Sequence, residues 1–170
     1  IADFDRPIKT LSLHKDGEPL IHPRIADMVR LAREKNIADK IVILTNASLL
    51  TRELATALIK AGLDVIRISV EHVTKNGYRK LTQTYDNYDT IVENIRCLRE
   101  ERDRLGSSLF IGAKLIDFGL SREELDIYSR DFSPLCDEVA RTTAQGWSLS
   151  EIFDFTLGAH PAVALDGQTP

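Results

Sequence analysis

A short run near the N-terminus, Asp16-Gly17-Glu18-Pro19, has the residue types of a ligand-binding turn. It follows an apolar, strand-like stretch at residues 8–14. The glycine permits a sharp turn or a close approach by a ligand, where a Cβ would clash. The proline stiffens the backbone, so the carbonyl groups of the turn point in fixed directions. We therefore predict a strand, turn and helix in this order, with a turn that presents backbone polar groups to a small molecule.

Polar residues stand at or near the ends of three later strand-like runs: Asn46 in the second, Ser69 in the third and Lys114 in the fourth. Asn46 could contact a ligand or end a strand, and Ser69 could contact a ligand or bond to a neighbouring strand. A buried lysine needs a partner, which a ligand carboxylate, Glu71 or Glu138 would provide. These side chains are candidates for a ligand site, with the structural alternatives left open.

The histidines and cysteines carry weaker signals. His14 and His22 flank the turn in no recognisable metal-binding spacing. We expect His72 at the surface, although it could transfer protons near neutral pH. Cys97 is expected to pack in the core as a small apolar residue, and Cys136 to have a structural role.

Strand-like runs alternate with helical patterns along the chain. Thr51 and Ser121 are suitable N-cap residues, and Gly62 is suited to the C-terminal end of a helix. The alternation predicts a parallel sheet with right-handed crossover connections. The expected strands are residues 8–14, 40–46, 65–70, 109–116 and 138–142, and the expected helices are residues 24–36, 52–61, 88–105 and 122–130.

One face of most expected strands is apolar and the other is repeatedly polar. A parallel strand covered by helices on both faces would be apolar on both. The pattern therefore predicts an α/β fold of the partial (βα) TIM-like barrel type, with the polar face toward a ligand-holding interior. Arg67, like Lys114, would face that interior and could bind an anion. The polar positions are Thr10, Ser12 and His14; Arg67, Ser69 and Glu71; and Gly112 and Lys114.

The composition is that of an ordinary enzyme domain. The net charge of −4 argues against binding to nucleic acid or to an anionic membrane. No apolar run approaches the roughly 18 residues of a membrane span, and no signal peptide is visible. Two cysteines without metal-like spacing are consistent with a cytoplasmic location. The charge run at residues 99–104 is expected to form a solvated helix face.

The ordered set of motifs resembles the radical S-adenosylmethionine (radical SAM) superfamily. Asp16-Gly17-Glu18-Pro19 is similar to the Gly-Gly-Glu-Pro loop of that family, with Asp16 in place of the first glycine. Thr45-Asn46-Ala47 is similar to its Thr-Asn-Gly strand end, and Ile68-Ser69-Val70-Glu71 to its Ile-Ser-Ile-Asp strand end. The resemblance implies binding of S-adenosylmethionine (SAM) by Asp16, Gly17, Glu18, Pro19, Asn46, Ser69 and Lys114.

The resemblance also implies radical chemistry at a four-iron four-sulfur cluster. In this family the cluster cleaves SAM reductively, and the 5′-deoxyadenosyl radical abstracts a hydrogen from the substrate. The signature Cys-x3-Cys-x2-Cys that binds the cluster does not occur in this sequence. We therefore expect a piece of a longer enzyme that is inactive alone. The alternatives are a non-catalytic relative that binds a ligand or partner, and a TIM-type lyase that uses Lys114.

The expected organisation is a radical SAM core fragment at residues 1–158 and a linker-like tail at residues 159–170. Residues 136–158 resemble a segment that leads into a SPASM or twitch extension. Expected partners are a small-molecule or peptide substrate and a reductant protein such as a flavodoxin or ferredoxin. The expected metal ligands lie upstream of this chain.

Overall fold

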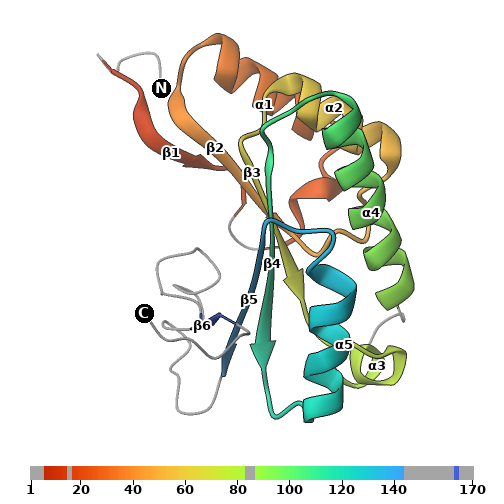
Figure 1. Ribbon diagram of the computed structural model, residues 1–170. Coiled ribbons are helices and arrows are strands. Elements are labelled where there is room, and N and C mark those ends of the chain that lie inside the picture. Colours follow the sequence, from red (N-terminus) through yellow and green to blue (C-terminus); the bar gives the residue numbers. More distant parts are fainter. Residues whose placement is uncertain (1–5, 15–16, 83–86, 144–162, 165–170) are drawn as a thin grey trace.

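The computed structural model describes residues 6–14, 17–82, 87–143 and 163–164. Five parallel strands lie in one sheet in sequence order, and β6 pairs antiparallel to β5 (Figure 1). The strands are β1 (Ile8–Ser12), β2 (Ala38–Thr45), β3 (Val65–Val70), β4 (Phe110–Asp117), β5 (Glu138–Thr143) and β6 (Val163–Ala164). The helices are η1 (Pro19–Ile21), α1 (Ile25–Glu34), α2 (Arg52–Ala61), α3 (Lys75–Thr82), α4 (Tyr88–Arg104) and α5 (Arg122–Phe132).

The predicted alternation of strands and helices is confirmed, and the fold is that of a partial TIM barrel. The helix α2 has the predicted bounds because its ends are encoded locally. Thr51 accepts a hydrogen bond from the Leu54 N–H, and Gly62 adopts a left-handed conformation with φ of 87°. Ser121 forms a capping box with Glu124 at the start of α5. These contacts are the capping interactions expected for the residue types.

β1 ends at Ser12, two residues before the predicted end at His14. The Leu13 N–H still donates to the Val42 carbonyl of β2 at 2.9 Å. The Leu44 N–H donates instead to Nδ1 of the His14 ring at 3.0 Å. The His14 side chain therefore takes the place of a backbone acceptor for the Leu44 N–H where the pairing of β1 with β2 ends.

Three elements were not predicted: η1, α3 and β6. Glu18 caps η1, because its carboxylate accepts a hydrogen bond from the Leu20 N–H at 2.9 Å. The α3 segment is short and polar and contains Gly77, but Tyr78 packs in the core with 3% of its surface exposed. β6 lies within the predicted tail, and the other residues of that tail lie outside the described part of the chain.

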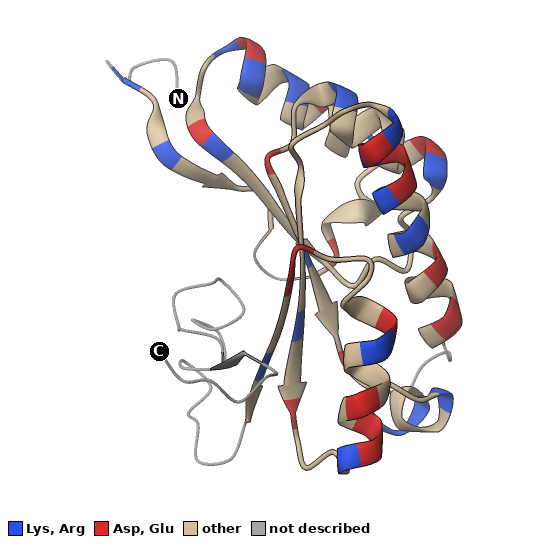
Figure 2. Cartoon of the chain, viewed as in Figure 1, with Lys and Arg blue, Asp and Glu red and all other residues tan. Residues whose placement is uncertain are grey.

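The described helices lie on one side of the sheet (Figure 1). The predicted division into an apolar and a polar strand face is confirmed by burial and register. Ser69 is paired with Lys114, and Arg67 with Gly112, on the face away from the helices. Figure 2 shows charged residues concentrated along the helices, with few on the strands. The strand residues buried toward the helices include Ile41, Ile43, Ile66, Ile68, Ile111, Ala113 and Leu115.

An aspartate directly before β3 joins three elements at the N-terminal edge of the sheet. The Asp64 carboxylate accepts a hydrogen bond from the Ile41 N–H of β2 at 2.7 Å. The same carboxylate pairs with Arg33 in the last turn of α1. The Asp64 side chain therefore connects the start of β3 to both β2 and α1.

The same arrangement recurs before β5. Asp137 accepts a hydrogen bond from the Ile111 N–H of β4 at 2.8 Å. Nη1 of Arg102, in the last turn of α4, binds both oxygens of Asp137 at 2.8 and 2.6 Å. Burial acts to raise the pKa of Asp137, but the bonds from Arg102 and the Ile111 N–H outweigh it and lower the pKa.

The prediction that residues 99–104 form a solvated face is wrong for two members. Arg102 is 8% exposed and Glu101 is 5% exposed. Glu101 accepts hydrogen bonds from Arg104 at 2.5 Å, Thr56 at 2.8 Å and Arg52 at 2.8 Å. These bonds lower the pKa of Glu101 to about 2. The charges are retained in the interior because each has opposite charges beside it.

The two cysteines differ from each other in burial. Cys97 was expected in the core, and this is wrong: it is half-buried and accepts a contact from the Arg52 guanidinium at 3.3 Å. Cys136 is buried, as a structural role requires, and burial raises the pKa of its thiol to about 12.

Candidate functional site

The predicted ligand turn lies directly after β1. Asp16 lies outside the described residues. Gly17 has a φ of 91°, a conformation that favours glycine, and a Cβ at this position would meet no atom within 4 Å. The backbone at Gly17 is therefore open to a neighbouring molecule. Pro19 is the first residue of η1, where its fixed φ and missing N–H are tolerated.

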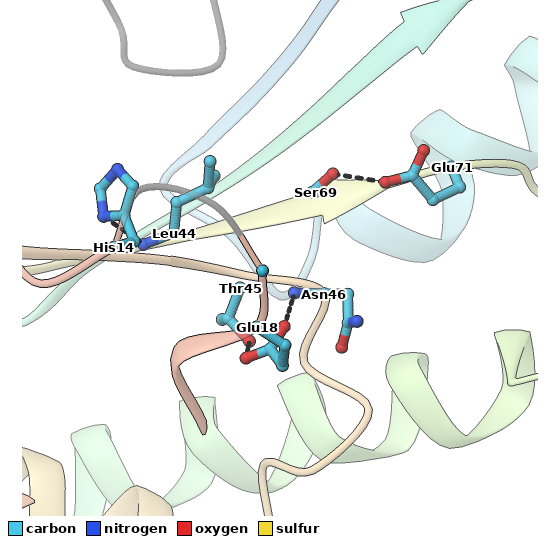
Figure 3. Close-up of a pocket in the computed structure, with 8 residues that line it drawn as sticks. His14, Glu18, Leu44, Thr45, Asn46, Ser69 and Glu71 are labelled. Atoms are coloured by element: carbon cyan, nitrogen blue, oxygen red, sulfur yellow. Dashed lines mark hydrogen bonds between the residues drawn. The ribbon is translucent and has the colours of Figure 1, made fainter. Parts of the chain in front are cut away.

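The carboxylate of Glu18 links this turn to the end of β2. Oε1 accepts hydrogen bonds from the Leu20 N–H at 2.9 Å and from the Thr45 hydroxyl at 2.6 Å. Oε2 accepts a hydrogen bond from the Asn46 N–H at 2.7 Å (Figure 3). Thr45 is 2% exposed, so its hydroxyl depends on Glu18 for an acceptor. Glu18 therefore fixes the position of the turn relative to the strand.

A pocket of about 290 Å³ opens where β1, β2 and β3 end. It brings together four of the predicted site residues, namely Gly17, Glu18, Asn46 and Ser69 (Figure 3). Pro19 and Lys114 are not among its lining residues in the described part of the chain. The lining consists of His14, Gly17, Glu18, Leu44, Thr45, Asn46, Ser69 and Glu71.

The polar side chains of the pocket are arranged by short local contacts. The Ser69 hydroxyl donates to Glu71 at 2.7 Å, and the Glu71 N–H donates to the Tyr78 hydroxyl oxygen at 3.1 Å. The Asn46 side-chain oxygen accepts hydrogen bonds from the Ser48 N–H at 2.9 Å and the Ser48 hydroxyl at 2.7 Å. Asn46 thus shapes its own turn, while Ser69 and Glu71 present a hydroxyl and a carboxylate to the pocket.

His14 lines the pocket. The sequence placed it on the polar strand face but did not predict it as a SAM-binding residue. Its Nδ1 accepts the Leu44 N–H, whereas its Nε2 is buried and has no hydrogen-bond partner among the described residues. Burial lowers the pKa of His14, against an opposing effect of the Val42 carbonyl. The sequence signals were its place on the polar face with Thr10 and Ser12 and its position at the end of the first strand, where ligand-binding residues of a barrel stand.

Lys114 is the sheet partner of Ser69 but is not among the residues that line the pocket. It is 5% exposed, and burial, followed by the nearby Arg67 charge, lowers its pKa to about 8. Arg67 itself forms an ion pair with Glu138 at 2.5 Å. Gly112 of β4 lies between Arg67 of β3 and Glu138 of β5 in the sheet. Because Gly112 has no Cβ, the Arg67 side chain has room beside it; a Cβ on Gly112 would lie 3.3 Å from Nη1 of Arg67.

His72 was expected at the surface, but its side chain is only 18% exposed. Nδ1 accepts the Val73 N–H at 2.9 Å, and Nε2 lies 3.7 Å from the Glu124 carboxylate. A Cβ on Gly77 would overlap the imidazole ring. A second pocket of about 270 Å³ lies beside this ring and is lined by Glu71, His72, Leu81, Ile116, Phe118, Gly119, Leu120 and Glu124.

The described residues contain no cluster of three His, Cys, Asp or Glu side chains that could hold a metal ion. Over the same residues, no helix has the length and apolar character needed to cross a membrane.

A family model described as the radical SAM superfamily matches residues 3–113. The chain belongs to the radical SAM superfamily. The match includes the Glu18 turn, Asn46 and Ser69. Ala47, which stands where the family motif has a glycine, adopts a left-handed φ of 58°, so the substitution preserves a backbone conformation that glycine favours.

Curated relatives include two proteins named GTP 3',8-cyclase. The protein of Limosilactobacillus fermentum is 27% identical over 176 residues, which cover 94% of this chain and 52% of that protein. The protein of Chlorobaculum tepidum is 39% identical over 67 residues, which cover 39% of this chain and 20% of that protein. The chain therefore spans about half or less of the length of these relatives.

Three solved structures share the fold of this chain. Coproporphyrinogen III oxidase from Escherichia coli aligns over 95% of this chain and 38% of its own, with a TM-score of 0.61 and 17% identity. Archaeal TYW1 aligns over 87% of this chain and 47% of its own, with a TM-score of 0.61 and 9% identity. Streptococcus suis SuiB, solved with bound S-adenosylmethionine, aligns over 88% of this chain and 34% of its own, with a TM-score of 0.54 and 15% identity.

Proposed function

We propose that this chain is the SAM-binding central part of a radical SAM enzyme, and that SAM binds in the pocket formed after β1, β2 and β3. The observation that carries the proposal is the convergence of Gly17, Glu18, Asn46 and Ser69 at this pocket. Membership of the superfamily supports the choice of SAM as the ligand.

The pocket fits part of a SAM molecule. Its volume of about 290 Å³ lies near the lower end of the range of sites that enclose a small molecule, about 300–1,000 Å³. The open backbone at Gly17 suits an amino group, which needs carbonyl acceptors. The Ser69 hydroxyl and the Glu71 carboxylate suit the ribose hydroxyls, because both can accept a hydrogen bond. Glu18 would act indirectly, by holding the turn beside β2.

The residues of this chain do not fit a four-iron four-sulfur cluster, because the sequence holds two widely separated cysteines and Cys136 is buried with a raised pKa. We propose that the cluster ligands lie in a segment upstream of this chain. With both groups bound, the family chemistry is reductive cleavage of SAM and removal of a hydrogen from the substrate. The contribution of this chain would be to orient SAM and to keep water from the reacting atoms.

We also propose the partners that this chemistry requires. A reductant protein such as a flavodoxin or ferredoxin would supply one electron. The substrate would be a small molecule or a peptide. The polar sheet face offers both signs of charge, because the Arg67–Glu138 ion pair and Lys114 lie on it, so it does not select one substrate class.

The test is anaerobic iron and sulfide reconstitution of the full-length protein, followed by measurement of SAM binding and of 5′-deoxyadenosine formation. We expect SAM binding, cluster absorbance and 5′-deoxyadenosine from the full-length protein. The 170-residue chain alone should give neither the absorbance nor the product. Binding of SAM without product would identify a non-catalytic relative, and absence of SAM binding would refute the proposed site.

A lyase that uses Lys114 receives less support from the structure. Lys114 does not line either of the two described pockets. Borohydride trapping of a carbonyl substrate on Lys114 would be needed to revive that alternative.

A further inference from the structure

The imidazole of His14 has one nitrogen with a hydrogen-bond partner and one without. Nδ1 accepts the Leu44 N–H at 3.0 Å. Nε2 is buried, and no residue in the described part of the chain is its hydrogen-bond partner. A buried polar atom without a partner loses its hydration without compensation, so such atoms are rare in folded proteins and often mark a ligand.

The contact at Nδ1 determines which nitrogen carries the proton. A nitrogen that accepts a backbone N–H has no hydrogen of its own, so the neutral ring carries its hydrogen on Nε2. Burial lowers the pKa of His14, which favours this neutral form at pH 7. The unpaired atom is therefore an N–H donor.

The position of this donor indicates what should satisfy it. The His14 ring forms part of the wall of the pocket that also contains Gly17 and Ser69 (Figure 3). A ligand in this pocket would lie beside the ring that carries the donor without a partner. The complement of an N–H donor is an acceptor oxygen, which SAM carries on its carboxylate and on its ribose.

We propose that His14 is a SAM-binding residue, and that its Nε2–H donates a hydrogen bond to an acceptor oxygen of the ligand. This inference rests on the proposed function. The second role of the ring is structural, because Nδ1 satisfies the Leu44 N–H at the end of β1. One ring nitrogen would therefore bind the Leu44 N–H of β2, and the other would bind the ligand.

Two substitutions separate these roles. In His14→Asn, the side-chain oxygen can occupy the place of Nδ1 and accept the Leu44 N–H, but no donor reaches the place of Nε2. In His14→Gln, the longer amide can place a donor near Nε2 and leaves the Leu44 N–H without its partner. His22→Asn is the matched control, because His22 is exposed beside the same turn.

The experiment is isothermal titration of SAM into the reconstituted full-length protein and these variants, with thermal unfolding measured in parallel. We expect His14→Asn to unfold near the wild-type temperature and to bind SAM about tenfold more weakly, as for the loss of one hydrogen bond. His14→Gln should bind more tightly than His14→Asn and unfold at a lower temperature. His22→Asn should match the wild type in both measurements.

Each outcome bears on the inference. If His14→Asn binds SAM as tightly as the wild type, His14 is only a strand-end residue and the inference is overturned. If the wild type does not bind SAM, the proposed function fails first and the inference fails with it. Titration of 5′-methylthioadenosine, which lacks the carboxylate, locates the acceptor. If His14→Asn binds 5′-methylthioadenosine more weakly than the wild type does, the acceptor is a ribose oxygen. If both bind it equally, the acceptor is the carboxylate of SAM.

Discussion

Replacement of Glu18 is expected to destabilise the protein in proportion to the hydrogen bonds that each substitution removes. Glu18→Ala removes three acceptor contacts, to the Leu20 N–H, the Thr45 hydroxyl and the Asn46 N–H. At about 1 kcal/mol net for each bond, the free energy of unfolding should fall by about 3 kcal/mol. Glu18→Gln can keep both contacts of Oε1, but its amide would face the Asn46 N–H, so we expect a loss of about 1.5 kcal/mol.

The assay is urea denaturation followed by far-UV circular dichroism, which gives the free energy of unfolding for each variant. Glu34→Ala is the control, because Glu34 forms an exposed pair with Arg30 at 3.1 Å, and the loss of this pair should cost less than about 0.5 kcal/mol. A double-mutant cycle of Glu18→Ala with Thr45→Val should give a coupling of about 1 kcal/mol. If Glu18→Ala costs no more than Glu34→Ala, the linkage of turn and strand by this carboxylate is refuted.

Three further predictions follow from burial and close contact. Gly77→Ala should lower the unfolding temperature, although alanine normally stabilises a helix, because the new Cβ would overlap the His72 ring; an increase would show that the ring moves freely. Burial lowers the pKa of Lys114 to about 8, below the unfolded value of about 10.4, so the unfolded chain binds more protons between these values. The stability of the wild type relative to Lys114→Met should therefore rise from pH 8 to about pH 10.4 in urea titrations, and a flat difference would contradict the shift. Iodoacetamide followed by mass spectrometry should label half-buried Cys97 and leave buried Cys136 unmodified in the folded protein, and labelling of Cys136 first would contradict its burial.

Much of the fold could be predicted because its signals are local. Thr51 and Gly62 set the ends of α2 within a few residues of sequence. The alternation of apolar and polar residues in Val65–Val70 indicated which face of β3 is buried. Gly17 and Ser69 could be expected near each other, and they line one pocket, because parallel strands place their carboxyl ends along one edge.

The features that were missed depend on contacts between residues far apart in the sequence. Glu101 is buried because Arg52, 49 residues earlier, reaches it from α2, and a charge run alone cannot show such a partner. The end of β1 depends on a contact from His14 to Leu44, 30 residues later. The missing partner of His14 Nε2 is likewise invisible in the sequence, because it is defined by what surrounds the ring.

The two aspartates at the N-terminal edge of the sheet have a consequence for the opposite edge. Side chains alternate between the faces of a strand, so a slip of one residue in pairing would exchange the faces of the whole strand. Asp64 holds β3 against β2 through the Ile41 N–H, and this register keeps Ser69 on the pocket side. At about 3.3 Å for each residue, the two ends of a six-residue strand such as β3 lie about 17 Å apart. The position of Ser69 at the pocket therefore depends on an alignment of β3 with β2 that Asp64 stabilises from the opposite end of the strand.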